Sequence, residues 1–195
     1  MLVTIPDRRN NSYSRVVVEI ADTCPVCGGP RGPLSAGQCR EGDIVSVWHN
    51  ECGHKDLYDD VIREAEGRAS AYGYAALVDA AVARGADLTL SASGKIFCHD
   101  EEGTHQMSAA WLLGWLRWGD AIADAYDALT DDERAQLEHA ERLAEDLDVT
   151  VVPAVGVDGV VRWHSDYFSS TGSGYSIVEL ETEMLSAICE LQQVA

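Results

Sequence analysis

Two short stretches decide how the first third of the chain is expected to fold: residues 23–29, which read TCPVCGG, and residues 48–54, which read WHNECGH. The first holds Cys24 and Cys27 in a C-x2-C spacing, and the second holds Cys52. Two groups of ligands in turns about twenty residues apart are a common way for a chain to build a tetrahedral zinc site. The spacing therefore predicts one zinc ion bound between the two turns.

The second stretch also carries a resemblance to a known class of protein. Its pattern Trp-His-x2-Cys-Gly-His resembles the second turn of zinc-ribbon proteins, commonly Trp-x-Cys-x2-Cys-Gly-His, with His49 standing where the first cysteine would be. The resemblance implies a single structural Zn²⁺ held by Cys24, Cys27, His49 and Cys52. Such a closed set leaves no position for water, so the metal would stabilise the fold rather than catalyse a reaction.

Two further residues could supply the fourth ligand in place of His49. Cys39 lies between the two stretches, and His54 would bind through a Cys-x-His arrangement with Cys52. Cysteines in a reducing compartment are more often metal ligands or buried thiols than disulfides. The sequence therefore leaves three candidates for one coordination position.

Each turn is expected to be delivered by a strand. Residues 16–20 (VVVEI) and residues 44–48 (IVSVW) are rich in β-branched and aromatic side chains, which favour strands. Residues 15–58 are therefore predicted to form the zinc ribbon, and the polar residues 1–14 an N-terminal tail.

Residues 59–195 are expected to form an acidic, mainly helical α+β domain. Apolar side chains recur at helical spacing in residues 59–84, 109–129, 130–147 and 177–194. Thr130 and Glu133 fit a capping box, and short β-hairpins are predicted around residues 92–94 and 158–159. The predicted fold class is α+β, a small N-terminal zinc ribbon followed by this domain.

The charge of the chain is strongly negative and unevenly distributed. The formal net charge is −19, and residues 58–195 carry 26 acidic against eight basic side chains. Such a chain repels nucleic acid, because phosphate binding depends on lysine and arginine. Four acidic residues recur every three or four positions along one predicted helix edge and form a candidate partner-binding surface: Asp120, Asp124, Asp127 and Asp131.

Three tryptophans share one face of the predicted helix over residues 109–129. Trp111, Trp115 and Trp118 stand at i, i+4 and i+7. Such a stripe belongs to a core, or, where it is exposed, anchors a partner protein. The sequence leaves this choice open.

The sequence also bears on location. It has no run of about 18 apolar residues, so no membrane span is expected, and the polar N-terminus lacks the apolar centre of a secretory signal. We therefore expect a cytoplasmic protein. The motif CPVCGGPRG opening a ribbon, in a short, acidic, arginine-biased chain, loosely resembles uncharacterised proteins of actinobacterial phages, which implies the host cytoplasm.

These features favour a non-enzymatic, zinc-stabilised protein that binds a protein partner, such as a basic nucleic-acid-binding protein, through an acidic surface that mimics nucleic acid. The alternative is a nucleic-acid-associated ribbon in transcription or DNA processing, which would rely on Arg15, Arg31, Arg40 and Lys55. A deaminase is disfavoured. In zinc deaminases the H-x-E motif comes before the C-x2-C pair, whereas here residues 49–51 come after the pair of Cys24 and Cys27.

Overall fold

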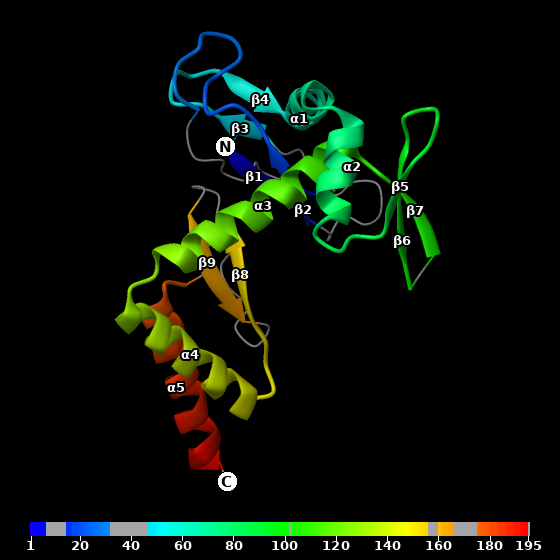
Figure 1. Ribbon diagram of the computed structural model, residues 1–195. Helices are drawn as coiled ribbons and strands as arrows, with labels where there is room; N and C mark the ends of the chain where they lie inside the picture. The colour runs from blue at the N-terminus through cyan, green and yellow to red at the C-terminus, as the bar shows by residue number, and fades with distance from the viewer. Residues whose placement is uncertain (7–14, 32–46, 102, 156–159, 166–174, 195) are drawn as a thin grey trace. The chain divides into compact units, whose positions relative to one another are not determined.

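The computed structural model describes the chain except residues 7–14, 32–46, 102, 156–159, 166–174 and 195 (Figure 1). Helices combine with several small antiparallel sheets, which confirms the α+β fold class. No helix in the described ranges is both long and apolar enough to cross a membrane. Residues 1–119 form one compact unit and residues 120–195 a second, whereas the domain boundary expected from the sequence follows residue 58.

The first sheet of unit 1 pairs β1 (Leu2–Pro6) with β2 (Arg15–Glu19). Val3, Ile5 and Val18 are buried, because alternate side chains of a strand share one face. The expected N-terminal tail is therefore a strand over its first residues. The rest of that tail, residues 7–14, lies outside the described part of the chain.

The second sheet carries the second cysteine turn. It pairs β3 (Val47–His49) with β4 (Lys55–Leu57), and the helix α1 (Tyr58–Tyr72) starts at the residue after β4. Val61 and Ala65 of α1 are buried against the β1–β2 sheet. The ribbon region and the first helix thus share one hydrophobic core, which explains why no compact unit ends at residue 58.

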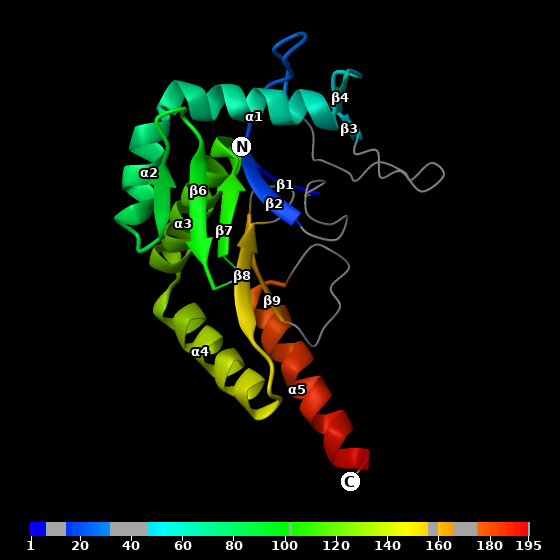
Figure 2. The same ribbon diagram turned by 90° about the vertical axis from the view of Figure 1, so that its right-hand side faces the viewer.

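The chain then builds a second core within unit 1. Gly73, at φ +97°, separates α1 from α2 (Tyr74–Val82). The strands β5 (Leu88–Leu90), β6 (Ile96–Asp100) and β7 (Gly103–Met107) form an antiparallel sheet (Figure 2). Its apolar side chains pack against α2 and against α3 (Ala109–Ala128).

The helix α3 joins the two cores of unit 1. Leu112, Leu113 and Leu116 pack in the core of the three-stranded sheet, while Ala110 packs against the β1–β2 sheet. At Gly114 the helix backbone lies directly on β2: a Cβ there would overlap the carbonyl oxygen of Val17. Only a residue without a side chain permits this approach.

Unit 2 combines helices with one β-hairpin. It contains the end of α3, the helices α4 (Asp131–Asp146) and α5 (Ile177–Val194), and the hairpin of β8 (Val151–Val155) and β9 (Val161–Ser165). Its core includes Leu137, Trp163 and Met184. The predicted capping box at the start of α4 is confirmed, because Thr130 and Glu133 exchange side-chain-to-backbone hydrogen bonds.

The contact of Gly114 with Val17 yields a first prediction. Gly114→Ala forces a methyl group into the backbone of β2, so we expect the free energy of unfolding of unit 1 to fall by about 3 kcal/mol or more. Gly67→Ala is the matched control, because Gly67 lies inside α1 with no atom within 4 Å of its added Cβ. This control should be stabilising by about 0.5–1 kcal/mol.

Urea unfolding followed by tryptophan fluorescence measures both changes. Equal effects of the two substitutions would contradict the close approach of α3 to β2.

Candidate metal centre

The first cysteine turn is held by its own backbone. An isolated bridge pairs Thr23 with Pro30, and the N–H of Cys24 donates to the Gly29 carbonyl at 2.7 Å. The N–H of Gly28 donates to the Cys24 carbonyl at 2.8 Å, with Gly28 at φ +72°. This positive φ folds the chain back after the second cysteine of the pair. Cys24 and Cys27 therefore face the same point.

The second turn closes the β3–β4 hairpin. The N–H of Asn50 donates to the His54 carbonyl at 2.9 Å, and the N–H of Gly53 donates to the Asn50 carbonyl at 2.9 Å. Gly53 adopts φ +84°. The turn brings the two side chains that flank Gly53 together: Cys52 Sγ and His54 Nδ1 lie 3.3 Å apart.

The two turns bring four ligand-type side chains together. One ligand atom from each of Cys24, Cys27, Cys52 and His54 lies within 4.8 Å of all the others. Around a tetrahedral zinc with bonds of about 2.0–2.3 Å, neighbouring ligand atoms stand about 3.5–3.8 Å apart. The cluster is thus close to the size of a four-coordinate site.

Two thiols of the cluster, Cys24 and Cys52, differ in acidity. Burial alone would raise the pKa of Cys24, but the backbone N–H groups of Val26 and Cys27 and hydrogen bonds with Cys52 and Cys27 lower it to about 7. The backbone N–H of His54 favours the Cys52 thiolate, yet burial and the neighbouring sulfurs raise the pKa of Cys52 above its ordinary value. Cys24 therefore ionises before Cys52, and a bound cation would favour ionisation of Cys52.

The cysteine trio expected from the sequence is thus brought together, and His54 joins it. The preferred fourth ligand, His49, has its backbone in β3, paired with Lys55, but its side chain lies outside the described part of the chain. The other alternate, Cys39, falls within residues 32–46, which also lie outside it. Of the three candidates, the described structure therefore places only His54 at the cluster.

A buried ion network lies between the two turns and α1. Arg31 Nε donates to Asp56 Oδ2 at 2.7 Å, and its Nη2 donates to Glu64 Oε2 at 2.7 Å. Its Nη1 donates to the Ala21 carbonyl at 2.9 Å. Asn50 Nδ2 donates to the same oxygen of Asp56 at 3.1 Å. The side chains of Arg31 and Asp56 are only 1% and 3% exposed.

The network connects segments that are far apart in the sequence. Arg31 follows the first turn, Asp56 lies in β4 after the second turn, and Glu64 lies in α1. Burial alone would lower the pKa of Arg31, but its hydrogen bonds with Glu64 and Asp56 raise that pKa above the ordinary value, so the side chain stays charged. Both turns are therefore fixed to α1 through one guanidinium group.

This role of Arg31 is not predicted from the sequence, where Arg31 is one of four basic side chains that could contact nucleic acid. The available signal was its position directly after the first turn, next to glycine and proline. That position does not identify the two carboxylates, because both come from later elements.

The acidic residues singled out from the sequence lie in unit 2. Asp124 and Asp127 are exposed on α3, and Asp131 is exposed at the start of α4. Asp120 is half-buried and already has an interaction within the protein. Three of the four carboxylates are thus open to solvent.

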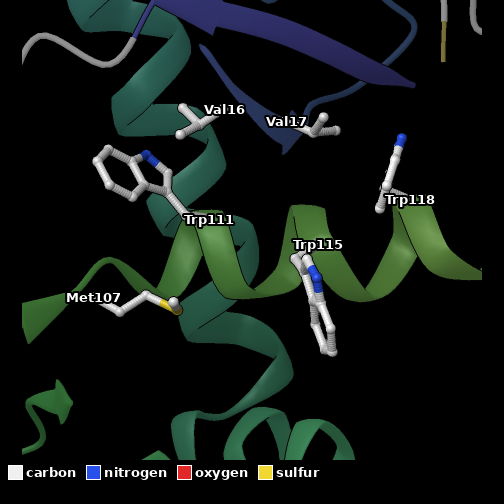
Figure 3. Close-up of a pocket in the computed structure, with 6 residues that line it drawn as sticks. All are labelled: Val16, Val17, Met107, Trp111, Trp115 and Trp118. Atoms are coloured by element: carbon white, nitrogen blue, oxygen red, sulfur yellow. The ribbon is translucent and has the colours of Figure 1, made fainter. Parts of the chain in front are cut away.

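The tryptophan stripe is only partly in the core. Trp111 packs at the edge of the β1–β2 core, while Trp115 is 41% exposed. The three indoles line an open apolar pocket of about 310 Å³ together with Val16, Val17 and Met107 (Figure 3). Trp111 and Trp118 extend to the side of the two valines, and Trp115 turns away from them.

Comparison of the chain with protein-family models, curated proteins and solved structures found no match. The residues of the candidate site are therefore the basis for a proposal about function. The strongest features of that site are the Cys24, Cys27, Cys52 and His54 cluster and the ion network beside it.

The ion network yields a second prediction. Arg31→Met leaves the buried carboxylate of Asp56 without a counter-charge, so we expect the free energy of unfolding of unit 1 to fall by about 3–5 kcal/mol. Arg63→Met is the matched control, on the helix α1 that carries Glu64, one of the two partners of Arg31. The Arg63 pair with Asp60 is exposed, at 76% and 48%, so its loss should cost less than about 1 kcal/mol.

Urea unfolding at neutral pH measures both variants. A loss for Arg31→Met as small as that for Arg63→Met would contradict the structural role of the network.

Proposed function

We propose that the chain binds one structural zinc ion through Cys24, Cys27, Cys52 and His54. The observation that carries this proposal is the convergence of four ligand atoms within 4.8 Å from two separate turns. Three thiolates and one imidazole are a standard ligand set for zinc, and their softness disfavours magnesium or calcium. His54 would bind through Nδ1, the ring nitrogen 3.3 Å from Cys52 Sγ.

The proposed zinc has a structural rather than a catalytic role. Four protein ligands complete a tetrahedral site and leave no open position for water or substrate. Without the metal, the three thiols meet in a small volume, and the lowered pKa of Cys24 favours a thiolate there. Zinc would join the first turn to the β3–β4 hairpin and contribute free energy to folding of the ribbon region.

Metal analysis tests this proposal. We expect about one zinc per chain by elemental analysis, and absorption bands of tetrahedral cobalt–thiolate bonding after cobalt substitution. Cys52→Ser and His54→Ala should each lower zinc affinity by about 100-fold or more, because each removes one of four ligands. Removal of zinc by a chelator should lower the midpoint of thermal unfolding.

The controls distinguish the candidate ligands. Cys98→Ser changes a thiol in β6, outside the cluster, and should leave zinc affinity unchanged. His49→Ala and Cys39→Ser should also leave it unchanged. A loss of affinity in His49→Ala together with normal affinity in His54→Ala would overturn the proposed fourth ligand.

We further propose that this zinc-stabilised protein is non-catalytic and binds a basic, nucleic-acid-binding protein through unit 2. Residues 120–148 hold eleven acidic side chains against two arginines. Asp131, Glu138 and Glu145 are exposed and recur every seven residues, so they share one face of α4. Leu137, Ala140 and Ala144 occupy its buried face.

The acidic side chains of residues 120–148 favour a partner with a positively charged surface. Unbalanced like charges destabilise a helix and accelerate association with a surface of the opposite charge. Complementarity to a groove that normally holds phosphates would make the array a mimic of nucleic acid.

Direct binding of nucleic acid has less support. Arg31, one of the four basic side chains that this alternative requires, is buried and paired with two carboxylates. Lys55 is exposed, and the side chains of Arg15 and Arg40 lie outside the described part of the chain. An acidic chain with so few available cations is poorly suited to neutralise phosphates.

A charge-neutralised variant tests the protein-binding proposal. The triple variant Asp124→Asn, Asp127→Asn and Asp131→Asn should lose about tenfold or more of its affinity for a basic protein captured from cell lysate, because three carboxylates no longer attract it. Duplex DNA should displace that protein from the original chain. Surface plasmon resonance at low and high salt measures both effects.

The matched control neutralises three exposed acids of unit 1: Asp79→Asn, Asp87→Asn and Glu101→Gln. It changes the net charge equally and should retain binding. An equal loss of affinity in both triple variants would show that net charge alone causes the effect, which would contradict a specific surface. The proposal would also be overturned if the original chain captured no protein that duplex DNA displaces.

A further inference from the structure

A second pocket of unit 1 is lined by two arginines, although the chain as a whole is strongly acidic. It has a volume of about 350 Å³ and is lined by Glu19, Arg68, Ala71, Tyr72, Leu113 and Arg117. These residues come from β2, α1 and α3, three elements that the core of unit 1 holds together. The pocket shares no lining residue with the cysteine cluster.

The charged residues that line the pocket are two arginines and one carboxylate. Arg68 Nη2 donates to Glu19 Oε1 at 2.7 Å, and Arg117 Nε donates to Glu19 Oε2 at 3.2 Å. Burial alone would raise the pKa of Glu19, but hydrogen bonds with Arg68 and Arg117 lower it below its ordinary value. One carboxylate is therefore shared by two guanidinium groups in a chain of net charge −19.

Arg68 keeps donors for a further acceptor. A guanidinium carries five N–H groups, and within the described part of the chain Arg68 uses one of them, toward Glu19. Its side chain is 39% exposed, so the remaining donors are accessible. The planar fork of arginine matches the two oxygens of a carboxylate or a phosphate.

The other residues of the pocket are apolar or aromatic. Leu113 is buried beneath it, and the Tyr72 ring lies under Arg117 with the guanidinium carbon 5.8 Å from the ring centroid. Stacking on the ring orients the guanidinium of Arg117. Inorganic phosphate would leave this apolar wall in contact with water, whereas an organic acid would cover it.

We propose that this pocket binds a small organic carboxylate, with its carboxylate on Arg68 and its aryl or alkyl group on Tyr72 and Leu113. The volume is near the lower end of small-molecule sites, which hold about 300–1,000 Å³. Glu19 positions the two guanidinium groups before the ligand arrives. This site is independent of the proposed zinc and of the proposed protein partner.

Ligand titration of the full chain tests the proposal. The probe is phenylacetate, with phenylacetamide as its uncharged analogue and inorganic phosphate as an anion without an organic group. We expect phenylacetate to bind, with amide shifts in the ¹H–¹⁵N spectrum at Arg68, Tyr72, Leu113 and Arg117. Phenylacetamide and phosphate should bind about tenfold or more weakly.

Two arginine variants of α1 provide the matched comparison. Arg68→Gln should weaken phenylacetate binding about tenfold or more, because it removes the charged fork. Arg63→Gln removes the same charge from an exposed position outside the pocket and should bind as the original chain does.

Several outcomes would overturn the proposal. They are no binding by the original chain at about 10 mM phenylacetate, equal binding of phosphate or of the amide, and equal affinities of the two variants. If Arg68→Gln does not fold, the shift map of the original chain decides: shifts confined to other residues would overturn the site. Such a result would leave the ion pairs with the purely structural role of connecting β2 to α1 and α3.

Discussion

The guanidinium of Arg31 is the group on which the arrangement of the first turns depends. Removing a charge from water costs several kcal/mol, and only well-placed partners offset that cost. Asp56 and Glu64 are those partners, and both accept from Arg31 at 2.7 Å. Because the partners come from β4 and α1, the charge is satisfied only when the turn, the hairpin and the helix are all in place. The cysteine cluster is thus built onto a helix and does not stand alone as a small module.

The local parts of this arrangement could be predicted from the sequence. The C-x2-C spacing and the glycines after Cys27 and Cys52 describe turns that depend on a few neighbouring residues. The identity of the fourth ligand could not be predicted, because it depends on how the turn at Gly53 directs Cys52 and His54 toward each other. Spacing alone gives several residues similar access to the metal.

The larger organisation was harder to predict for a different reason. Val3 and Ile5 form a short alternating apolar pattern, but most of residues 1–14 are polar, so a strand was not expected there. Residues 2–6 become a strand because they pair with β2. The stripe of Trp111, Trp115 and Trp118 fixes one face of α3 but not its neighbours. Gly114 marks where α3 meets β2, a contact between distant segments that no local pattern identifies.

The same contact has a consequence for how the chain is made. Glu19 of β2 and Arg117 of α3 are paired although they are 98 residues apart in the sequence. At a synthesis rate of about 5–20 residues per second, the β1–β2 sheet waits roughly 5–20 s before α3 can cover it. During that interval α1 covers part of the sheet, and the part of β2 that α3 contacts is available to chaperones or to a second nascent chain. The surface of β2 that α3 covers therefore needs protection at the ribosome for longer than the surface that α1 covers.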